Sequence, residues 1–319
     1  MKIAVIGAGA FGTALANVIK NDHEIVLYSR NKELADSINA TRRNGSIFPH
    51  KLLSKKIKCT AAIADARDAD LVFLCLPSHA ILGFVKSMDL SPQSVVINGA
   101  KGFGAGKKLI PQILSEIIPN EICSLKGPSF ASELILEVPT SFTLASDSRQ
   151  SFEKISSVFR NEIVVFDYTQ DVNGVEILSI LKNIYAIIIG IVDACYNSPN
   201  TRFLTFTKAL NEINSILKHF KVPVETMFCY AGIGDFGLTS LNDLSRNRTL
   251  GLLIGKGFFG NEISNTVVLE GVKAIDTLIE TIPTSLQEKL PLIQNLDQLI
   301  KGKMTVRQFV DVIIFPERG

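Results

Sequence analysis

One charged side chain, Lys182, lies in the otherwise apolar stretch ILSILKNIYAIIIGIV at residues 177–192, with Asn183 beside it. Apolar residues fall on every face of the helix that this stretch predicts, so the lysine is expected among hydrophobic neighbours. Such surroundings disfavour the charged form of an amine and are costly unless the amine has a function. Proton transfer is a chemistry that uses such an amine. The alternative is a lysine at the edge of a core helix, with its ammonium in water.

A second chemical feature stands at the start of the chain, where GAGAFG places Gly7, Gly9 and Gly12 in the pattern G-x-G-x-x-G. In this pattern the first glycine allows a sharp turn, the second allows close approach of a pyrophosphate, and the third allows the helix to pack on the strand. The phosphates are expected at the helix N-terminus, where N–H groups and the helix dipole favour negative charge. The pattern follows a strand-like run and opens a helix, which is the context of a dinucleotide site. The alternative is a glycine-rich turn without a ligand.

The end of the second strand-like run bears on the choice of cofactor. Sites specific for NAD present an Asp or Glu about 20 residues beyond the glycines, which holds the ribose hydroxyls. This chain has Ser29 and Arg30 there. A hydroxyl and a guanidinium suit a 2′-phosphate, so NADPH is favoured over NADH, with a solvated arginine as the alternative.

The stretch DLSRNRTLG predicts a third chemical feature, a helix start that binds phosphate. Ser245 is a candidate N-cap, Arg246 offers a fork of donors, and the first amides of the helix point outward.

Strand-like and helix-like segments alternate through the first half of the chain. The strand-like runs are KIAVIG, EIVLYSR, LVFLCLPS, SVVING, TSFTLA and IVVFDY, and the helical segments include residues 10–20, 32–40, 108–118 and 152–159. Continuous apolar strands that alternate with helices predict a mainly parallel sheet covered on both faces, the doubly wound Rossmann-type α/β architecture.

Strand signals stop after Tyr168, and the rest of the chain has helical periodicity. The predicted helices are residues 175–195, 202–220, 244–254, 272–282 and 286–300. A last helix begins at TVRQF, where Thr305 and Gln308 have the spacing of a capping box. We therefore predict a dinucleotide-binding domain at residues 1–168 and an all-helical substrate domain at residues 169–319.

Composition describes a soluble protein with large cores. The chain has 319 residues, of which 46% are hydrophobic and 20% charged, and two domains are expected for this length. A net charge of +2 argues against general affinity for nucleic acid. The basic stretches TRRNG at residues 41–45 and KLLSKKIK at residues 51–58 are interpreted as solvated loops.

Cysteine usage and hydropathy predict a cytoplasmic protein. The five cysteines form no CxxC pair and no metal-ligand spacing, so no metal site is expected, and Cys75 is interpreted as a core residue. Glycines interrupt the apolar run at the N-terminus, which argues against a signal peptide. The uncharged part of the long apolar stretch, residues 183–192, is too short to cross a bilayer.

Four further stretches resemble the bacterial NAD(P)-dependent glycerol-3-phosphate dehydrogenase family. They are NGAKGF at residues 98–103, KGPSFASE at 126–133, LKNIYAI at 181–187 and AGIGDFGLTSLNDLSRNRTLG at 231–251. The resemblance covers nearly the whole chain. It implies reversible hydride transfer between NAD(P)H and dihydroxyacetone phosphate, which gives sn-glycerol 3-phosphate for glycerophospholipid synthesis.

The resemblance also implies roles for single residues. Lys182 matches the family's proton acceptor, and Asp235 joins its network with the substrate. Substrate contacts are implied for Lys101, Gly127, Ser129, Asn183, Ser245, Arg246 and Asn247. Cofactor contacts are implied for Gly7, Gly9, Ala10, Phe11, Gly12, Arg30, Lys101, Ala131, Arg246 and Glu270.

Some residues depart from the family pattern. The family usually has Ser-Trp after the second glycine, where this chain has Ala10 and Phe11. Thr207, Lys208 and Ala209 stand where the family has Thr-Arg-Gly, and GDFGLTS replaces Gly-Asp-Leu-Val-Leu-Thr-Cys. These changes keep the main polar groups and put turnover and substrate fit in question.

Two alternative functions stay open at this point. One is another two-domain dehydrogenase that acts on a 3-hydroxy acid or its phosphate, since those enzymes also use a helix lysine followed closely by asparagine. The other is a non-catalytic protein that senses NAD(P). The phosphate-binding helix start argues against an unphosphorylated substrate, and Lys101, Lys182, Asp235 and Arg246 together argue against a sensor. A homodimer formed through the helical half is possible for this architecture.

Overall fold

The computed structural model describes residues 1–258 and 270–315 and divides the chain into two compact units, Met1–Val175 and Glu176–Gly319. The division falls a few residues after the predicted boundary at residue 168, inside the first turn of a long helix.

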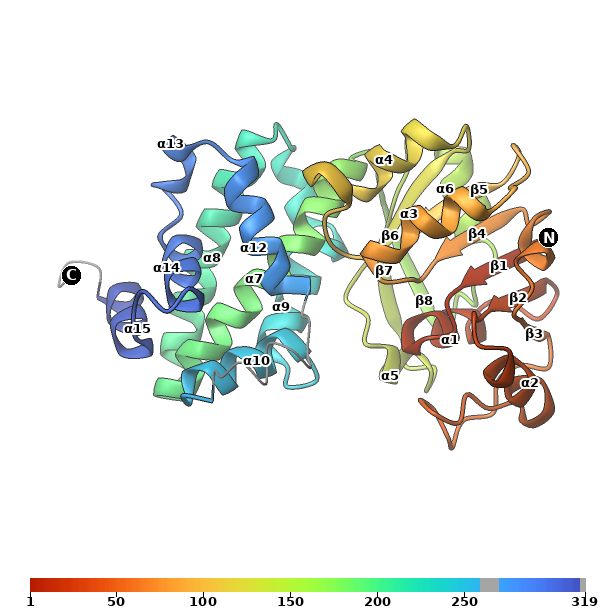
Figure 1. The fold of residues 1–319 in the computed structure, drawn as a ribbon, viewed down its shortest axis with the longest axis horizontal. Coiled ribbons are helices and arrows are strands. Elements are labelled where there is room, and N and C mark those ends of the chain that lie inside the picture. The colour runs from red at the N-terminus through yellow and green to blue at the C-terminus, as the bar shows by residue number, and fades with distance from the viewer. Residues whose placement is uncertain (259–269, 316–319) are drawn as a thin grey trace. The chain divides into compact units, whose positions relative to one another are not determined.

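The first unit is built on one sheet of eight strands (Figure 1). The strands are β1 Lys2–Ile6, β2 Glu24–Tyr28, β3 Ile57–Thr60, β4 Leu71–Leu74, β5 Val95–Asn98, β6 Ile122–Lys126, β7 Thr140–Ala145 and β8 Val164–Thr169. Their spatial order is β3-β2-β1-β4-β5-β6-β7-β8, and all neighbours are parallel except β6 and β7. The order reverses between β1 and β4, which is where open α/β sheets bind ligands.

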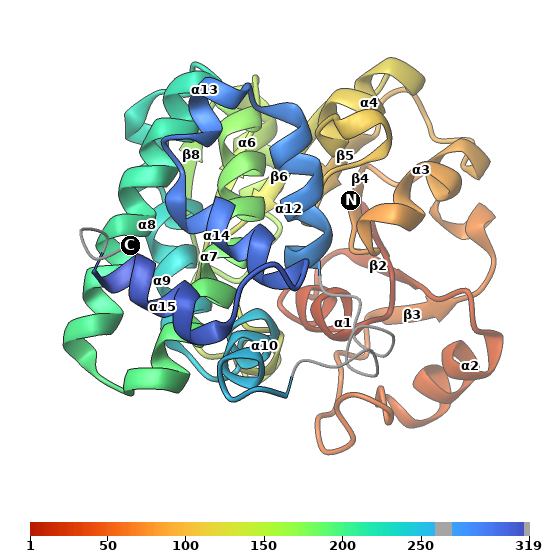
Figure 2. The same cartoon turned by 60° about the vertical axis from the view of Figure 1, so that its left-hand side comes forward.

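Alternate residues of the central strands enter two separate cores, one on each face of the sheet. Ile3 and Val5 of β1 belong to one core, and Ala4 and Ile6 belong to the other. Helices α1 Ala10–Asn17, α2 Lys32–Thr41 and α6 Arg149–Ser156 contribute to the first core, and α3 Ser78–Ser87 and α4 Ile110–Ile117 to the second. The ribbon views show α1 and α2 on the side of the sheet away from α3 and α4 (Figures 1 and 2). The predicted doubly wound, mainly parallel sheet is confirmed.

The sequence prediction missed two strands of this sheet. β3 begins inside the basic stretch at residues 51–58, so the interpretation of that whole stretch as a solvated loop is wrong. Ile57 and Cys59 point inward while Lys58 stays exposed, a short alternating pattern at the edge of the sheet. β6 was missed because ICSLK contains a serine and a lysine, both of which are buried here.

The second unit is helical, as predicted. Its elements are α7 Val172–Tyr196, which begins in the last residues of the first unit, α8 Pro199–His219, the short turns η3 Val224–Phe228 and η4 Tyr230–Gly234, α9 Asp235–Leu241, α10 Arg246–Gly255, α12 Glu270–Thr281, α13 Thr284–Gln287, α14 Pro291–Ile300 and α15 Val306–Ile314. The predicted capping box is present, with Thr305 accepting from the Gln308 N–H and the Gln308 side chain accepting from the Thr305 N–H.

One predicted helix of this unit, residues 286–300, is wrong as a single element. Pro291 divides it into α13 and α14 because proline has no N–H and excludes the helical conformation at the residue before it. Leu290 accordingly has φ −121° and ψ 59°.

Helix α7 is the centre of this unit. It has 25 residues and is apolar enough to span a membrane by length and composition, although its uncharged part alone is short. Its most apolar window is 100% buried in the structure, as for the core helix of a soluble protein.

Close contacts between glycines bring α10 against α7. A Cβ on Gly251 would overlap the Ile187 carbonyl oxygen, and one on Gly190 would overlap the Arg248 carbonyl oxygen. Gly255 approaches Ile191 and Ala194 in the same way. The two backbones therefore touch, and this contact fixes where the first turn of α10 lies beside α7.

A buried carboxyl group links three helices of the same core. Glu212 of α8 accepts hydrogen bonds from the Tyr185 hydroxyl at 3.0 Å and from the Leu292 N–H at 2.6 Å. Burial raises the pKa of Glu212 to about 7, although the hydrogen bonds act in the opposite direction. Burial also raises the pKa of the Tyr185 hydroxyl, and the neighbouring Glu212 adds to that rise.

Glu212 makes the stability of the helical unit depend on pH. Its folded pKa of about 7 lies above the ordinary value of 4.5, so its contribution is complete below pH 4.5 and is lost as pH rises through 7. The corresponding free energy is on the order of 3 kcal/mol. We expect Glu212→Gln to flatten the decline of unfolding free energy between pH 5 and 8, measured by urea unfolding. Parallel pH profiles for the two proteins would contradict this assignment.

Candidate functional site

The Lys182 ammonium lies inside the helical unit. The residue is 2% exposed, and its Nζ makes an ion pair with the Asp235 carboxylate and a hydrogen bond of 3.2 Å to Thr239 Oγ1. A lysine whose ammonium reaches water is therefore excluded. The carboxylate compensates the positive charge where water is scarce.

Helix α9 brings both partners to the lysine. Asp235 is its first residue, and Thr239 follows one turn later, so both side chains lie on the same face. The chain enters α9 through the tight turn η4, where a Cβ on Gly232 would overlap the Met227 carbonyl oxygen. The Asp235 side chain caps no helix, so it is not explained as a helix cap. Thr239 was not predicted, because its contact is with Lys182, 57 residues earlier in the chain.

The neighbouring Asn183 is also buried, at 6% exposure. Its side-chain amide donates to the Ser179 carbonyl oxygen one turn earlier, at 3.3 Å. A Cβ on Gly271, in the first turn of α12, would lie 2.8 Å from Asn247 Oδ1 and 3.1 Å from the Asn183 carbonyl oxygen. The absence of a side chain at Gly271 thus lets α12 approach both asparagines. Glu270 begins α12, and its side chain lies outside what the structure describes.

The first turn of α10 presents the predicted phosphate-binding residues. Ser245 is the N-cap and accepts a hydrogen bond from the Arg248 N–H at 3.3 Å. Arg246 is exposed and makes no ion pair with any residue that the structure describes. Asn247 is half-buried, and its Oδ1 accepts no hydrogen bond from the described residues. The first N–H groups of a helix lack acceptors within it, so this turn is suited to an anion.

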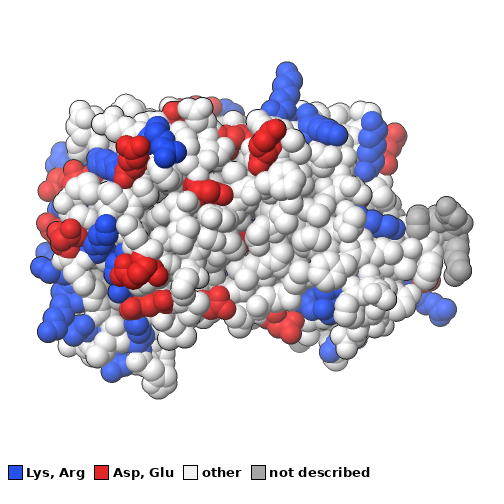
Figure 3. Space-filling view, turned by 180° about the vertical axis from the view of Figure 1, so that it is seen from behind, with Lys and Arg blue, Asp and Glu red and all other residues white. Residues whose placement is uncertain are grey.

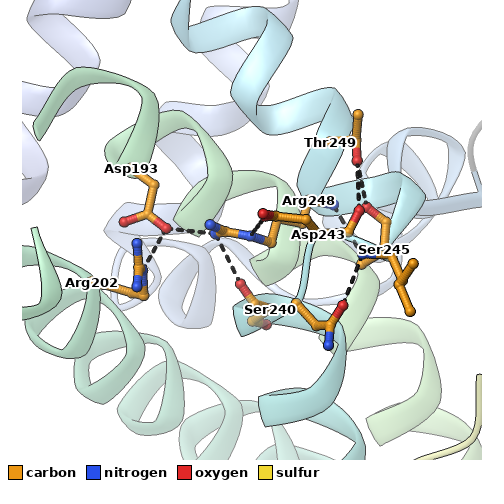
Figure 4. A network of polar contacts seen from close by, with 9 residues as sticks. Asp193, Arg202, Ser240, Asp243, Ser245, Arg248 and Thr249 are labelled. Atoms are coloured by element: carbon orange, nitrogen blue, oxygen red, sulfur yellow. Dashed lines mark hydrogen bonds and ion pairs between the residues drawn. The ribbon is translucent and has the colours of Figure 1, made fainter. Parts of the chain in front are cut away.

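Arg248 points away from that turn, into the unit. It is 5% exposed and contacts Asp193, Ser240 and Asp243 (Figure 4). The sequence does not distinguish the roles of Arg246 and Arg248, because two arginines two positions apart look equivalent until the fold is known.

The glycine turn of the first unit has three distinct geometries. Gly7 has φ 117°, and a Cβ there would lie 2.6 Å from the Cys75 carbonyl oxygen. A Cβ on Gly12 would overlap the Gly7 carbonyl oxygen, so only glycine allows α1 to lie this close to the turn. A Cβ on Gly9, the N-cap of α1, would meet nothing within 4 Å. The open space at Gly9 suits an approaching ligand.

A buried asparagine holds this turn. Asn44 is fully buried, and its Nδ2 donates to the Ala8 carbonyl oxygen and to Thr13 Oγ1, each at 2.9 Å. The interpretation of residues 41–45 as a solvated loop is therefore wrong at Asn44. The basic neighbours of Asn44 masked its role in the sequence.

Phe11 and Ala131, both predicted to contact the cofactor, pack against the core beside the glycine turn. Phe11 contacts Phe142 edge to face, with 6.2 Å between ring centroids, and reaches Gly99 after β5. Ala131, the first residue of the short helix α5 Ala131–Leu134, packs with Phe11 against the same core. Ala10 is exposed at the start of α1.

The end of β2 carries the predicted ribose-phosphate residues. Ser29 is buried, and its Oγ accepts from the Asn31 N–H at 3.2 Å. Arg30 is exposed and makes no ion pair with any residue in the described part of the chain. Its guanidinium is therefore available to an anion.

The remaining predicted residues follow the ends of β5 and β6. Lys101 is half-buried in the loop after β5, and Ser129 donates to the Gly127 carbonyl oxygen at 3.4 Å. Packing alone explains a glycine at position 127, because a Cβ there would overlap the Ser141 carbonyl oxygen of β7. Lys126 was missed: it is 1% exposed, and its ammonium donates to the Asn98 carbonyl oxygen at 2.9 Å.

The cysteines of the first unit offer no alternative nucleophile. Burial raises the pKa of the Cys75 and Cys123 thiols to about 12 and that of Cys59 to about 11. They stay protonated at neutral pH, and a thiol is a poor nucleophile. The described residues of the helical unit thus offer a buried amine paired with a carboxylate and a helix start suited to an anion.

Comparisons with known proteins identify the family. Residues 2–152 match the family described as NAD-dependent glycerol-3-phosphate dehydrogenase N-terminus, and residues 171–311 match its C-terminus. A curated glycerol-3-phosphate dehydrogenase [NAD(P)+] of Methanothermobacter thermautotrophicus is 33% identical over 99% of this chain and 100% of its own length. One of Leptospira biflexa is 34% identical over 86% of this chain and 85% of its own length.

A solved structure extends the likeness to three dimensions. Glycerol-3-phosphate dehydrogenase from Coxiella burnetii superposes with a TM-score of 0.89 at 25% identity, over 98% of both chains. The chain belongs to the NAD(P)-dependent glycerol-3-phosphate dehydrogenase family of oxidoreductases.

Proposed function

We propose that this protein is a glycerol-3-phosphate dehydrogenase [NAD(P)+]. It transfers hydride reversibly between NAD(P)H and dihydroxyacetone phosphate, which gives sn-glycerol 3-phosphate for glycerophospholipid synthesis. The observation that carries the proposal is the buried Lys182 ammonium, held by Asp235 and Thr239 in the same unit as the anion-binding start of α10.

The residues of the first unit fit a nicotinamide dinucleotide. The open space at Gly9 and the N-terminus of α1 would hold the pyrophosphate, with Gly7 and Gly12 shaping the turn. Ala10, Phe11 and Ala131 would lie beside the cofactor. When bound, the cofactor supplies or accepts the hydride.

Lys182 would move the proton that accompanies the hydride. In ketone reduction its ammonium gives a proton to the oxygen that becomes the hydroxyl, and in alcohol oxidation its neutral amine takes that proton back. Asp235 stabilises the ammonium, and the Thr239 hydroxyl directs the Nζ.

The substrate would be recognised by its phosphate and its hydroxyls. Arg246, Asn247 and the Ser245-capped first turn of α10 would bind the phosphate, with Arg246 also near the nicotinamide cofactor. Lys101, Gly127, Ser129 and Asn183 are proposed as further substrate contacts. Lys101 and Glu270 are proposed as further cofactor contacts.

The runner-up is another two-domain dehydrogenase that acts on a 3-hydroxy acid or its phosphate. The exposed Arg246 at a helix N-terminus argues against the unphosphorylated acid. A sensor of NAD(P) would not need a buried ion pair between Lys182 and Asp235, which is costly to keep.

We further propose a cytoplasmic protein that acts on small molecules, with no nucleic acid partner, no membrane insertion and a possible homodimer. All five cysteines are free, as in a reducing compartment. On the face drawn in Figure 3, basic and acidic side chains are interspersed, and no continuous basic surface for nucleic acid is seen.

The phosphate of the substrate is expected to decide turnover. Dihydroxyacetone phosphate should consume NADPH rapidly, while unphosphorylated dihydroxyacetone should react poorly because it lacks the group that Arg246 binds. The loss of NADPH absorbance measures both rates. Folded protein that turns over neither substrate with NADPH or NADH would favour the sensor function.

Removal of the amine should stop chemistry but not cofactor binding. We expect Lys182→Ala to lower kcat by about 10²–10⁴-fold, because a general acid–base contributes this much. The dissociation constant of NADPH, measured by fluorescence titration, should change little. Lys256→Ala, at an exposed lysine after α10, is the control and should retain activity. A Lys182→Ala variant with near-wild-type turnover would refute the assignment.

Arg30 is proposed to give the protein a preference for NADPH over NADH. We expect Arg30→Ala to lower kcat/KM for NADPH by about 10-fold, the loss of one charge-assisted contact, while NADH is little affected. Steady-state kinetics with both cofactors measure this ratio. Arg67→Ala, at another exposed arginine of the same unit, should leave the ratio unchanged. An equal loss for both cofactors would argue against a role in reading the 2′-phosphate.

A further inference from the structure

We infer that Arg248 is a positioning residue that fixes the first turn of α10 and thereby sets recognition of the substrate phosphate. This inference rests on the proposed function. Arg248 itself does not touch the phosphate; Arg246 and Asn247, which precede it, form the binding surface.

The guanidinium of Arg248 joins three segments of the helical unit. Its Nη1 donates to Asp193 Oδ2 at 2.6 Å, near the end of α7, and to the Ser240 carbonyl oxygen at 3.1 Å, near the end of α9. Its Nε donates to Asp243 Oδ1 at 3.0 Å, in the connection between α9 and α10 (Figure 4). Three of its five N–H groups are therefore engaged with protein oxygens.

The charges in this cluster balance without an external anion. Arg202 of α8 donates to the same Asp193 oxygen at 2.6 Å, so two arginines face two aspartates, Asp193 and Asp243. Asp193 is 3% exposed, and a buried carboxylate of this kind needs its partners. A phosphate therefore gains nothing from Arg248. Arg246, two residues earlier, is exposed and pairs with no acidic side chain among the described residues.

Helix geometry links the two arginines. Residues two positions apart on an α-helix point in different directions, so holding Arg248 inward turns Arg246 outward. Ser245 Oγ accepts a hydrogen bond from the Arg248 N–H. Arg246 and Asn247 therefore lie, along the chain, between two residues that are both held in place. Further along α10, Gly251 lies against α7. The helix is fixed at both points, so its first amides keep one orientation.

Removal of the Arg248 side chain should therefore weaken recognition of the substrate phosphate and leave recognition of the rest of the substrate unchanged. Without this side chain, the first turn of α10 loses its side-chain hydrogen bonds to α7 and α9. The backbone contact with Gly190 of α7 remains, but it does not hold the orientation of the phosphate-binding side chains. Affinity for phosphate should fall, while proton transfer by Lys182 and cofactor binding by the first unit should remain.

The test compares Arg248→Met and Arg248→Lys with Arg202→Met, a matched control that removes the other arginine on Asp193. Three quantities are measured: kcat/KM for dihydroxyacetone phosphate relative to dihydroxyacetone, the dissociation constant of NADPH, and the dissociation constant of inorganic phosphate by calorimetry. For Arg248→Met we expect that relative kcat/KM to fall at least 10-fold, mainly through KM, and phosphate binding to weaken at least 10-fold. The dissociation constant of NADPH should change by less than 2-fold. Arg248→Lys should show a smaller loss of relative kcat/KM and of phosphate affinity than Arg248→Met. Arg202→Met should resemble the wild type in all three quantities.

Three results would overturn the inference. The first is an unchanged preference for the phosphorylated substrate in folded Arg248→Met. The second is an equal loss for both substrates, which a merely structural role predicts. The third is the same loss in Arg202→Met, which would assign the effect to the charge of Asp193.

Two cases need a different measurement: a variant that does not fold, and a wild type that does not reduce dihydroxyacetone phosphate. If Arg248→Met does not fold, Asp243→Asn takes its place, because Asp243 is exposed and its substitution removes one contact of Arg248. Asp243→Asn should also weaken phosphate binding. Unchanged phosphate binding in this variant would count against the inference. Where the wild type does not reduce dihydroxyacetone phosphate, the proposed function fails, while phosphate affinity still tests Arg248.

Discussion

The ion pair between Lys182 and Asp235 is the constraint around which the helical unit is arranged. Both residues are almost fully buried, so each charge has lost most of its hydration. Either residue alone would be an uncompensated buried charge, which costs several kcal/mol. Helices α7 and α9 must therefore hold them together, and the sharp turn at Gly232 allows α9 to do so. A pair this costly is understandable as a device for proton transfer.

The contact between α7 and α10 is a second constraint in the helical unit. Three glycines bring the two helix backbones together, and the Arg248 network ties the start of α10 to the ends of α7 and α9. The same long helix therefore supports both Lys182, the proposed proton donor, and the first turn of α10, the proposed phosphate site. In the first unit, Asn44 has a comparable role, since it holds the glycine turn from a different part of the chain. In both units, a buried polar side chain determines the shape of a surface that would bind phosphate.

The features predicted from the sequence are those with local signals. Continuous apolar strands predicted the sheet, and the glycine spacing predicted the turn before α1. The lone lysine in an apolar helix left a buried amine and an ammonium in water as alternatives, and the family resemblance favoured the buried amine. The boundary near residue 168 and the roles assigned to single residues stay predictions.

The features that were missed depend on contacts between distant parts of the chain. Asn44 contacts Ala8 and Thr13, Arg248 contacts Asp193, and Thr239 gains meaning only once Lys182 lies beside it. Edge strand β3 was hidden because its exposed lysine breaks the apolar run, and its pairing with β2 is not visible locally. Pro291 did carry a local signal, and its break of the helix was overlooked in favour of periodicity.

A crystal structure with NADPH and a non-reducible analogue of dihydroxyacetone phosphate tests the central claim most directly. We predict that Lys182 Nζ lies within hydrogen-bond distance of the oxygen that takes the place of the ketone, with Asp235 still paired to the ammonium and the phosphate at the first turn of α10. An analogue bound with its ketone oxygen remote from Lys182, or a nitrogen directed into solvent in that complex, would contradict the account.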